Sequence, residues 1–287
     1  MALSNGVLVH GPTAWACAIR LPDGRLEVAS DFKRYRSTGV TNPLLRGPAR
    51  LAEAIALLPQ VRRRLPEAKL PFERPRVLTA MAAGAAVVQV ARGSKRLGPA
   101  AQELVSAIAS LVPAAVALRS SDLAAYHGAE HIAIGSYEHG EAREKEHERC
   151  GSHLLGPLLG TLAIGNMLAS RAPAQFRLAA RGLASLGALA ASTEIFSWMV
   201  RNPEHRVSKA LSRPGHELQH RLATAEPTPD QLEVAEAALA ACLELEHGHN
   251  SNRAAPTRDF RPPSREDARR LLHGRVLQSR SLGAVAG

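Results

Sequence analysis

The sequence predicts a mainly α-helical bundle with a small N-terminal β-hairpin. Three observations predict this fold: an alternating segment near the N-terminus, four long uncharged segments in the middle, and a well-capped helix near the C-terminus. The chain has 287 residues, of which 45% are hydrophobic and 22% charged, as in ordinary globular proteins. This composition excludes wholesale disorder and leaves ample chain for a buried core.

The predicted hairpin turns at Pro22-Asp23-Gly24. Apolar side chains alternate with their neighbours over residues 15–21, and the alternation resumes at Leu26 after the turn. A helix is expected next at about residues 48–58, where Pro59 should interrupt it. A proline-rich stretch then indicates a linker.

Four segments in the middle of the chain carry no charged side chain: residues 77–91, 104–118, 154–170 and 182–193. Each is shorter than the roughly 18–20 residues that span a bilayer, and many of their positions are Ala or Gly. If they pair as two hairpins, basic residues fall in the outer turns, against the positive-inside tendency. Deep insertion, shallow insertion and burial inside a compact helical domain therefore stay open.

The C-terminal part has the clearest helix start. Thr228 is a natural N-cap, Pro229 suits the first helical position, and Gln231 completes a capping box. Gly248 should end this helix, and a short amphipathic helix is expected at residues 265–277. The sequence thus divides into residues 1–76 (hairpin, helix and linker), 77–249 (helical core with the capped helix) and 250–287 (linker and tail).

The charge and cysteine content narrow the class of protein. A net charge of +10 suggests nucleic acid or an anionic membrane as partner. Aromatic residues are only 3%, too few for base stacking, so nucleic acid is the less favoured partner, and a basic nucleic-acid binder stays a rival function. Cys17, Cys150 and Cys242 lie far apart, which excludes a disulfide scaffold and a zinc ribbon and suits a reducing compartment. Residues 1–10 lack the pattern of a secretory signal.

An acidic, histidine-rich region in this basic chain indicates a cation site. Residues 119–153 hold five of the twelve histidines and seven acidic against four basic side chains. Within them, His127, Glu130 and His131 form an H-x-x-E-H array, which a helix would present on one face. The two imidazoles could bind one divalent ion, with Zn, Fe and Mn as candidates, and the carboxylate could ligate or act as general base. The alternative is a solvated helix face.

More donors follow this array. Cys150 could be a soft ligand, a nucleophile beside a histidine, or a small buried apolar residue. His139 and His147 are flanked by charges and are expected at the surface. Arg149 could hold an anionic substrate or pair with a neighbouring glutamate.

These motifs together resemble the signature of the YqhQ-like family. The resemblance rests on His127-Gly128-Ala129-Glu130-His131, Tyr137-Glu138, Gly140, His147 and Arg149-Cys150-Gly151. It extends outward to Gly11-Pro12, Trp15-Ala16, Pro22-Asp23-Gly24, Leu45-Arg46-Gly47, Pro214-Gly215, Leu218-Gln219, Glu226-Pro227 and 230–235. Four positions depart from the family pattern: His10 replaces Arg, Ile132 replaces Lys, and Ser152-His153 replaces a Thr-Ser pair.

The resemblance implies a metal-dependent membrane enzyme with its motifs on the cytoplasmic side of a bacterial membrane. Glu194 matches a family carboxylate, although a pairing with Arg181 or Arg201 explains it equally. For the third ligand, Glu138 ranks before His153 and Cys150. The implied site comprises Glu130 as catalytic residue, the metal ligands His127, His131, Glu138 and His153, and the further candidates Cys150, Glu194 and Arg149.

The sequence therefore predicts a membrane-associated, metal-dependent enzyme that acts on a small molecule. A hydrolase using metal-activated water is the default reaction. A metal-assisted rearrangement or group transfer on a small biosynthetic metabolite is an alternative, and a non-catalytic membrane or assembly factor with a structural histidine cluster is another. Integral, peripheral and soluble cytoplasmic locations all stay open.

Overall fold

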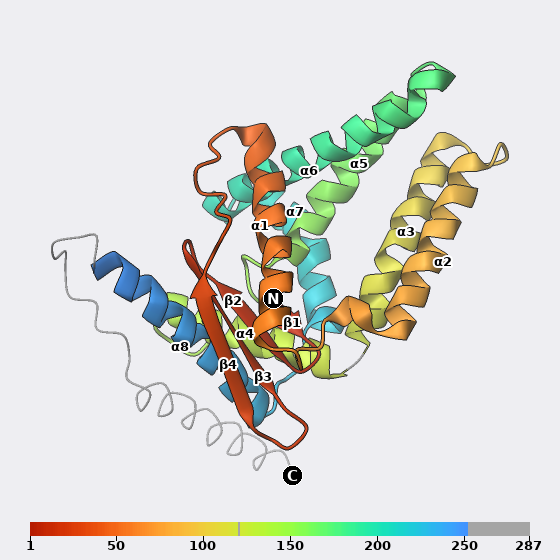
Figure 1. The fold of residues 1–287 in the computed structure, drawn as a ribbon. Helices are drawn as coiled ribbons and strands as arrows, with labels where there is room; N and C mark the ends of the chain where they lie inside the picture. The colour runs from red at the N-terminus through yellow and green to blue at the C-terminus, as the bar shows by residue number, and fades with distance from the viewer. Residues whose placement is uncertain (120, 252–287) are drawn as a thin grey trace, which may run out of the picture.

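The N-terminal part of the chain folds into a four-stranded antiparallel sheet (Figure 1). The computed structural model describes residues 1–119 and 121–251. The strands follow one another in sequence order: β1 (Ala2–Leu3), β2 (Gly6–His10), β3 (Ala14–Arg20) and β4 (Leu26–Phe32). Gly24 adopts a φ of 85° in the turn between β3 and β4, which glycine reaches without strain. The predicted hairpin is confirmed, and it forms the second half of a larger sheet.

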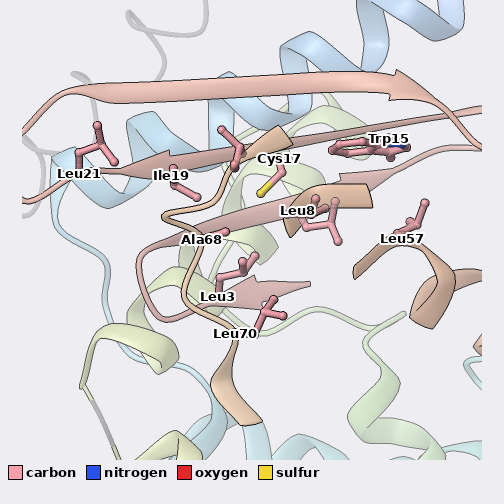
Figure 2. Close-up of a cluster of buried hydrophobic side chains, with 11 residues drawn as sticks. Leu3, Leu8, Trp15, Cys17, Ile19, Leu21, Leu57, Ala68 and Leu70 are labelled. Atoms are coloured by element: carbon pink, nitrogen blue, oxygen red, sulfur yellow. The ribbon is translucent and has the colours of Figure 1, made fainter. Parts of the chain in front are cut away.

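Side chains of β3 alternate between two cores, one on each face of the sheet. Trp15, Cys17 and Ile19 are fully buried against α1 (Pro43–Arg64). Figure 2 shows this first core, in which Ala68 and Leu70 from within the expected linker also take part. Ala68 lies in it, so the stretch after α1, with its single turn η1 (Pro71–Glu73), packs on the sheet.

The opposite face of the sheet packs on two helices, α4 (Ser121–His139) and α8 (Pro229–Ser251). The contacts are made by small side chains, among them Ala18 of β3, Ala129 of α4 and Val234 of α8, all fully buried. Small residues let the helices approach the strands closely. The histidine-bearing helix α4 is thereby fixed to the sheet.

Helix α1 is longer than expected. Asn42 caps its N-terminus by accepting a hydrogen bond from the backbone N–H of Leu44 at 2.9 Å. Pro59 lies inside the helix, so the expected end at this residue is wrong. Leu57 and Val61, on either side of the proline, are buried in the first core, and this burial offsets the hydrogen bond that proline removes.

Helix α8 is capped as predicted and tied to the sheet near its C-terminal end. The backbone N–H of Thr228 donates to the Gln231 side chain at 2.9 Å, and the Gln231 N–H donates to the Thr228 hydroxyl at 3.3 Å. Glu246 accepts hydrogen bonds from the backbone N–H groups of Thr13 and Ala14, both at 2.7 Å. The helix passes Gly248, where it was expected to end. The helix expected at residues 265–277 lies outside the described residues.

Two helical hairpins project away from the sheet on the same side of the molecule (Figure 1). One consists of α2 (Pro75–Gly93) and α3 (Pro99–Leu118). The other begins with the turn η2 (Gly151–Leu154) and consists of α5 (Leu155–Ser170), the turn η3 (Ala174–Phe176) and α6 (Arg177–Arg201). Helix α7 (Arg206–Leu218) and the π-helical turn η4 (Gln219–Ala223) then lead the chain back to α8.

Large apolar side chains of these hairpins are exposed. Leu178 is 85% exposed, Val90 74% and Leu183 71%. Three segments are long and apolar enough to cross a membrane: Ala100–Leu118, Gly151–Ser170 and Ala174–Arg201. The uncharged runs understate these lengths because the apolar segments continue beyond them, in two of the three cases through charged residues. The predicted mainly α fold with a small N-terminal sheet is confirmed.

Candidate metal centre

Two histidines of α4 and a cysteine from the following loop meet at one point. The imidazole rings of His127 and His131, one helical turn apart, have centroids 4.3 Å from each other. The Cys150 Sγ lies 3.6 Å from the His127 Nε2. One donor atom from each of the three residues lies within 4.8 Å of the other two, close enough to hold a metal ion. We call this group the His₂Cys cluster.

The His127 ring is oriented by the π-helical turn η4. Its Nδ1 lies 2.9 Å from the carbonyl oxygen of Ala223, and because a carbonyl only accepts, this nitrogen carries the proton. The turn comes this close because residue 128 is glycine: a Cβ there would lie 2.2 Å from the carbonyl oxygen of Ala225. The Nε2 of His127 is left facing the Cys150 Sγ.

The His131 ring is oriented in the same manner by the loop after α4. Its Nδ1 donates to the carbonyl oxygen of Lys145 at 2.6 Å, and the side chain is buried. Metal-binding histidines commonly donate their second ring N–H to a carbonyl or carboxylate, which fixes the tautomer. Both histidines of the cluster therefore have the arrangement that a metal ligand needs.

Gln219 positions the loop that carries Cys150. Its amide is fully buried at the start of η4, accepts from the backbone N–H of His147 at 2.9 Å, and donates to the Ser152 hydroxyl at 2.7 Å. One side chain thus fixes the loop on both sides of Cys150. π-Helical turns are frequent at functional sites, and here the turn supplies both Gln219 and the Ala223 carbonyl.

The charge on Cys150 differs from that of the core cysteines. Burial would raise the pKa of Cys150, but hydrogen bonds to His127 and His131 outweigh it and lower the pKa to about 4. Burial likewise opposes a charge on His127, yet Cys150 and Glu130 raise the pKa of its imidazole. Burial raises the pKa of Cys17 to about 12. Cys150 therefore carries the thiolate, the form that binds metals and attacks electrophiles.

Glu130 is not one of the cluster's converging donors although it lies on the same helix. One of its carboxylate oxygens pairs with the amino group of Met1, and the other has no partner among the described residues. Burial would raise the pKa of Glu130, but the Met1 ammonium and His127 outweigh it and lower the pKa. A ligand or general-base role for Glu130 stays a prediction.

Glu138 and Arg149 form an ion pair in the lining of a polar cavity of about 380 Å³ beside the cluster. Glu138 accepts from Arg149 at 3.2 Å and lies 3.2 Å from the His147 Nε2. His147 is half-buried rather than at the surface, with its ring centroid 5.6 Å from that of His131. Glu138 is thus outside the His₂Cys cluster. It contacts His147, which lines the cavity and lies beside His131 of the cluster.

The remaining candidates lie elsewhere. His153 is buried, with its Nδ1 3.1 Å from the carbonyl oxygen of Ser212 and its Nε2 3.0 Å from the Gln219 amide nitrogen. Glu194, on α6, pairs with Arg46 of α1 rather than with Arg181 or Arg201. Neither is part of the His₂Cys cluster, and a metal role for either stays a prediction. Among the expected donors, the cluster contains His127, His131 and Cys150.

One family model matches the part of the chain that builds this centre. Residues 117–245 match the family described as a protein of unknown function (DUF1385). The chain carries a DUF1385 domain. The domain extends from the end of α3 into α8 and includes the His₂Cys cluster and Gln219. No curated protein and no solved structure matches the chain. The resemblance to the YqhQ-like family, including its metal-dependent activity, stays a prediction.

Proposed function

We propose that this chain is a membrane-associated enzyme that uses a divalent metal ion held by His127, His131 and Cys150. The convergence of these three donors carries the proposal. Three protein ligands leave one position for water or substrate, as in catalytic zinc sites, whereas structural zinc sites close with four. The thiolate favours zinc or iron over manganese, because manganese prefers oxygen ligands.

The reaction class that these residues support is metal-assisted hydrolysis or group transfer. A bound zinc ion lowers the pKa of its water toward 7 or polarises an oxygen of the substrate. The cavity beside the cluster, at about 380 Å³, suits a small molecule. Arg149, which lines it, offers a planar donor for an anionic group, and the Glu138–His147 pair offers a proton acceptor in the cavity wall.

The membrane part of the proposal is supported by the hairpins. Three segments have the length and composition of a span, and their large apolar side chains are exposed. Contiguous exposed apolar surface of this kind is rare on soluble proteins. A carbonate wash of cell membranes separates integral from peripheral attachment. Recovery of the full chain in the soluble fraction of lysed cells, before any wash, would contradict both kinds of attachment.

Metal analysis tests the site. The full chain, purified in detergent without chelator, should contain about one zinc or iron ion per molecule, because the cluster offers three ligands for one ion. His131→Ala and Cys150→Ser should lose this metal, whereas His139→Ala, which changes an exposed histidine outside the cluster, should keep it. Cobalt substitution should give a thiolate-to-cobalt absorption band that Cys150→Ser abolishes. A metal-free wild-type protein that also takes up no cobalt would contradict the proposal.

One observation favours a second function, a cysteine nucleophile without metal. The lowered pKa of Cys150, to about 4, beside the raised pKa of His127 is the pattern of a thiolate–imidazolium pair. Iodoacetamide labelling at mildly acidic pH distinguishes the two functions. Rapid alkylation of Cys150 in protein that binds no metal would favour the nucleophile, and protection of Cys150 by bound metal would favour the metal enzyme.

A further inference from the structure

A second cavity lies at the base of the α2–α3 hairpin, away from the His₂Cys cluster. It has a volume of about 460 Å³ and is lined by Arg74, Pro75, Arg76, Val77, Val116 and Arg119. The two helices meet here at the first turn of α2 and the last turn of α3. Val77 and Ala117 are buried with Leu123 of α4, so this base is fixed to the body of the molecule.

The cavity is strongly basic. Three of its six lining residues are arginines and none is acidic. Within the described chain, these guanidinium groups have no carboxylate partner, and the neighbouring Glu73 pairs with Arg62 instead, at 3.6 Å. The first turn of α2 has no acidic residue and no side-chain cap, so no carboxylate of that turn neutralises the arginines. Unpaired guanidinium groups arranged in this way suit a phosphate group.

The position of the cavity relative to the apolar hairpin indicates which phosphate. The candidate span Ala100–Leu118 ends one residue before Arg119. Helix α2, with 19 residues, is about 28 Å long at 1.5 Å per residue, close to the thickness of a bilayer's hydrocarbon core. Leu78 and Met81, one turn and two turns along α2 from the arginines, are exposed. A ligand with its phosphate at the arginines would thus have apolar helix surface for its chains.

We propose that Arg74, Arg76 and Arg119 form a binding site for the phosphate of an anionic glycerophospholipid at the base of the α2–α3 hairpin. This site rests on the membrane association in the proposed function, and it is independent of the metal. The lipid phosphate accepts from the guanidinium groups, and its acyl chains lie along α2 and α3. The site would set the depth of the hairpin and orient the domain against an anionic leaflet.

Native mass spectrometry of the full chain in detergent tests this site, with dioleoylphosphatidylglycerol and dioleoylphosphatidylcholine as probes. The wild type should retain phosphatidylglycerol about tenfold more tightly than phosphatidylcholine, since three arginines add to the attraction. A triple variant, Arg74→Gln, Arg76→Gln and Arg119→Gln, should lose this preference. A control triple variant, Arg34→Gln, Arg63→Gln and Arg213→Gln, removes the same charge from exposed positions elsewhere and should keep it.

Two further measurements, on a lysine variant and on displacement by inorganic phosphate, separate the possible outcomes. Lysine at the three cavity positions should retain part of the preference, which separates lost charge from misfolding. Equal retention of phosphatidylglycerol by the glutamine variant and the control would overturn the site. If inorganic phosphate at about micromolar to millimolar concentration displaces the lipid, the ligand is a soluble phosphate and the lipid assignment is overturned.

The failure of this proposal is distinguishable from failure of the proposed function. Wild-type protein that binds phosphatidylglycerol and phosphatidylcholine equally would remove the lipid site and leave membrane association intact. Absence of the full chain from cell membranes would remove membrane association itself. Metal content, measured in the same preparations, should be unchanged in the glutamine variant, because the cavity shares no residue with the His₂Cys cluster.

Discussion

Apolar side chains are buried in one region of the molecule and exposed in another. The first region is the sheet with its covering helices, and the second is the pair of helical hairpins. Trp15 and Val234 are fully buried between the sheet and its helices, whereas Leu178 and Leu183 on α6 are 85% and 71% exposed. Both regions are rich in alanine and leucine, so composition does not separate them. The difference is that α1, α4 and α8 cover a face of the sheet, whereas the hairpins pack on other helices, α6 on α1 among them, and leave Leu178 and Leu183 exposed. Under the proposed membrane association, a bilayer covers these exposed apolar faces.

The largest expected effect comes from the buried side. Trp15→Ala should lower the free energy of unfolding by about 3–5 kcal/mol, because it empties the centre of the first core. Thermal or urea unfolding of the detergent-solubilised chain, followed by near-ultraviolet circular dichroism, measures this loss. A change below about 1 kcal/mol would contradict the two-sided packing of β3.

Removing the buried amide of Gln219 should lower the affinity for metal more than the stability of the fold. Gln219→Ala releases the loop that carries Cys150 and should weaken metal binding by about 10–100-fold, the usual effect of losing a residue that orients ligands. Competition with a fluorescent chelator measures the affinity. Gln60→Ala, on α1, removes an amide far from the cluster and should leave the affinity unchanged. An unchanged affinity in Gln219→Ala, with the cobalt–thiolate band intact, would exclude the positioning role.

Acid should weaken the sheet region through Glu246. Burial would raise the pKa of this carboxyl, but hydrogen bonds from Thr13 and Ala14 outweigh it and lower the pKa. The stabilisation is therefore complete above the ordinary pKa of glutamate and is lost as the pH falls through the lowered folded-state value. Glu246→Gln should cost about 1–3 kcal/mol at neutral pH, and the difference from wild type should shrink on acidification. The exposed Glu244→Gln is the control, and a gap that stays constant with pH would contradict this assignment.

The smallest effect on stability is expected in the hairpins. Leu178→Ala should change the free energy of unfolding by less than about 0.5 kcal/mol, because the side chain has little protein to pack against. The combined change of Leu178, Leu183 and Leu186 to glutamine should nevertheless reduce the membrane-bound fraction in a vesicle-flotation assay. A large loss of stability in Leu178→Ala would mean that another protein surface, rather than lipid, covers α6.

Local patterns were sufficient to predict much of the fold. The alternation at residues 15–21 and the turn at Pro22-Asp23-Gly24 identified β3 and β4, and the capping box identified the start of α8. Strand β1, with two residues, is too short to show a period. The predicted end of α1 at Pro59 was wrong. The sequence shows that proline removes a helix hydrogen bond, but it does not show the compensating burial of Leu57 and Val61, which depends on a sheet distant in sequence.

The site was predictable only in part, for a similar reason. Helical spacing was sufficient to bring His127 and His131 together, since residues four apart share a helix face. The same spacing grouped Glu130 with them, but its side chain turned to the Met1 amino group, a partner that no periodicity indicates. Cys150 ranked behind Glu138 and His153 because the path of its loop depends on Gln219, 69 residues further along the chain. The hydrogen bonds that orient both histidines go to the backbone carbonyl groups of Lys145 and Ala223, and side-chain identity does not indicate such acceptors.

The position of η4 along the chain determines when the His₂Cys cluster can form during synthesis. Both hairpins and both ligand-bearing segments leave the ribosome before Gln219 and Ala223 do. Until then, the His127 tautomer is not fixed and the Cys150 loop lacks its anchor. Under the proposed function, nascent chains should therefore contact the lipid before they bind the ion tightly, and chains truncated before residue 219 should bind the ion weakly.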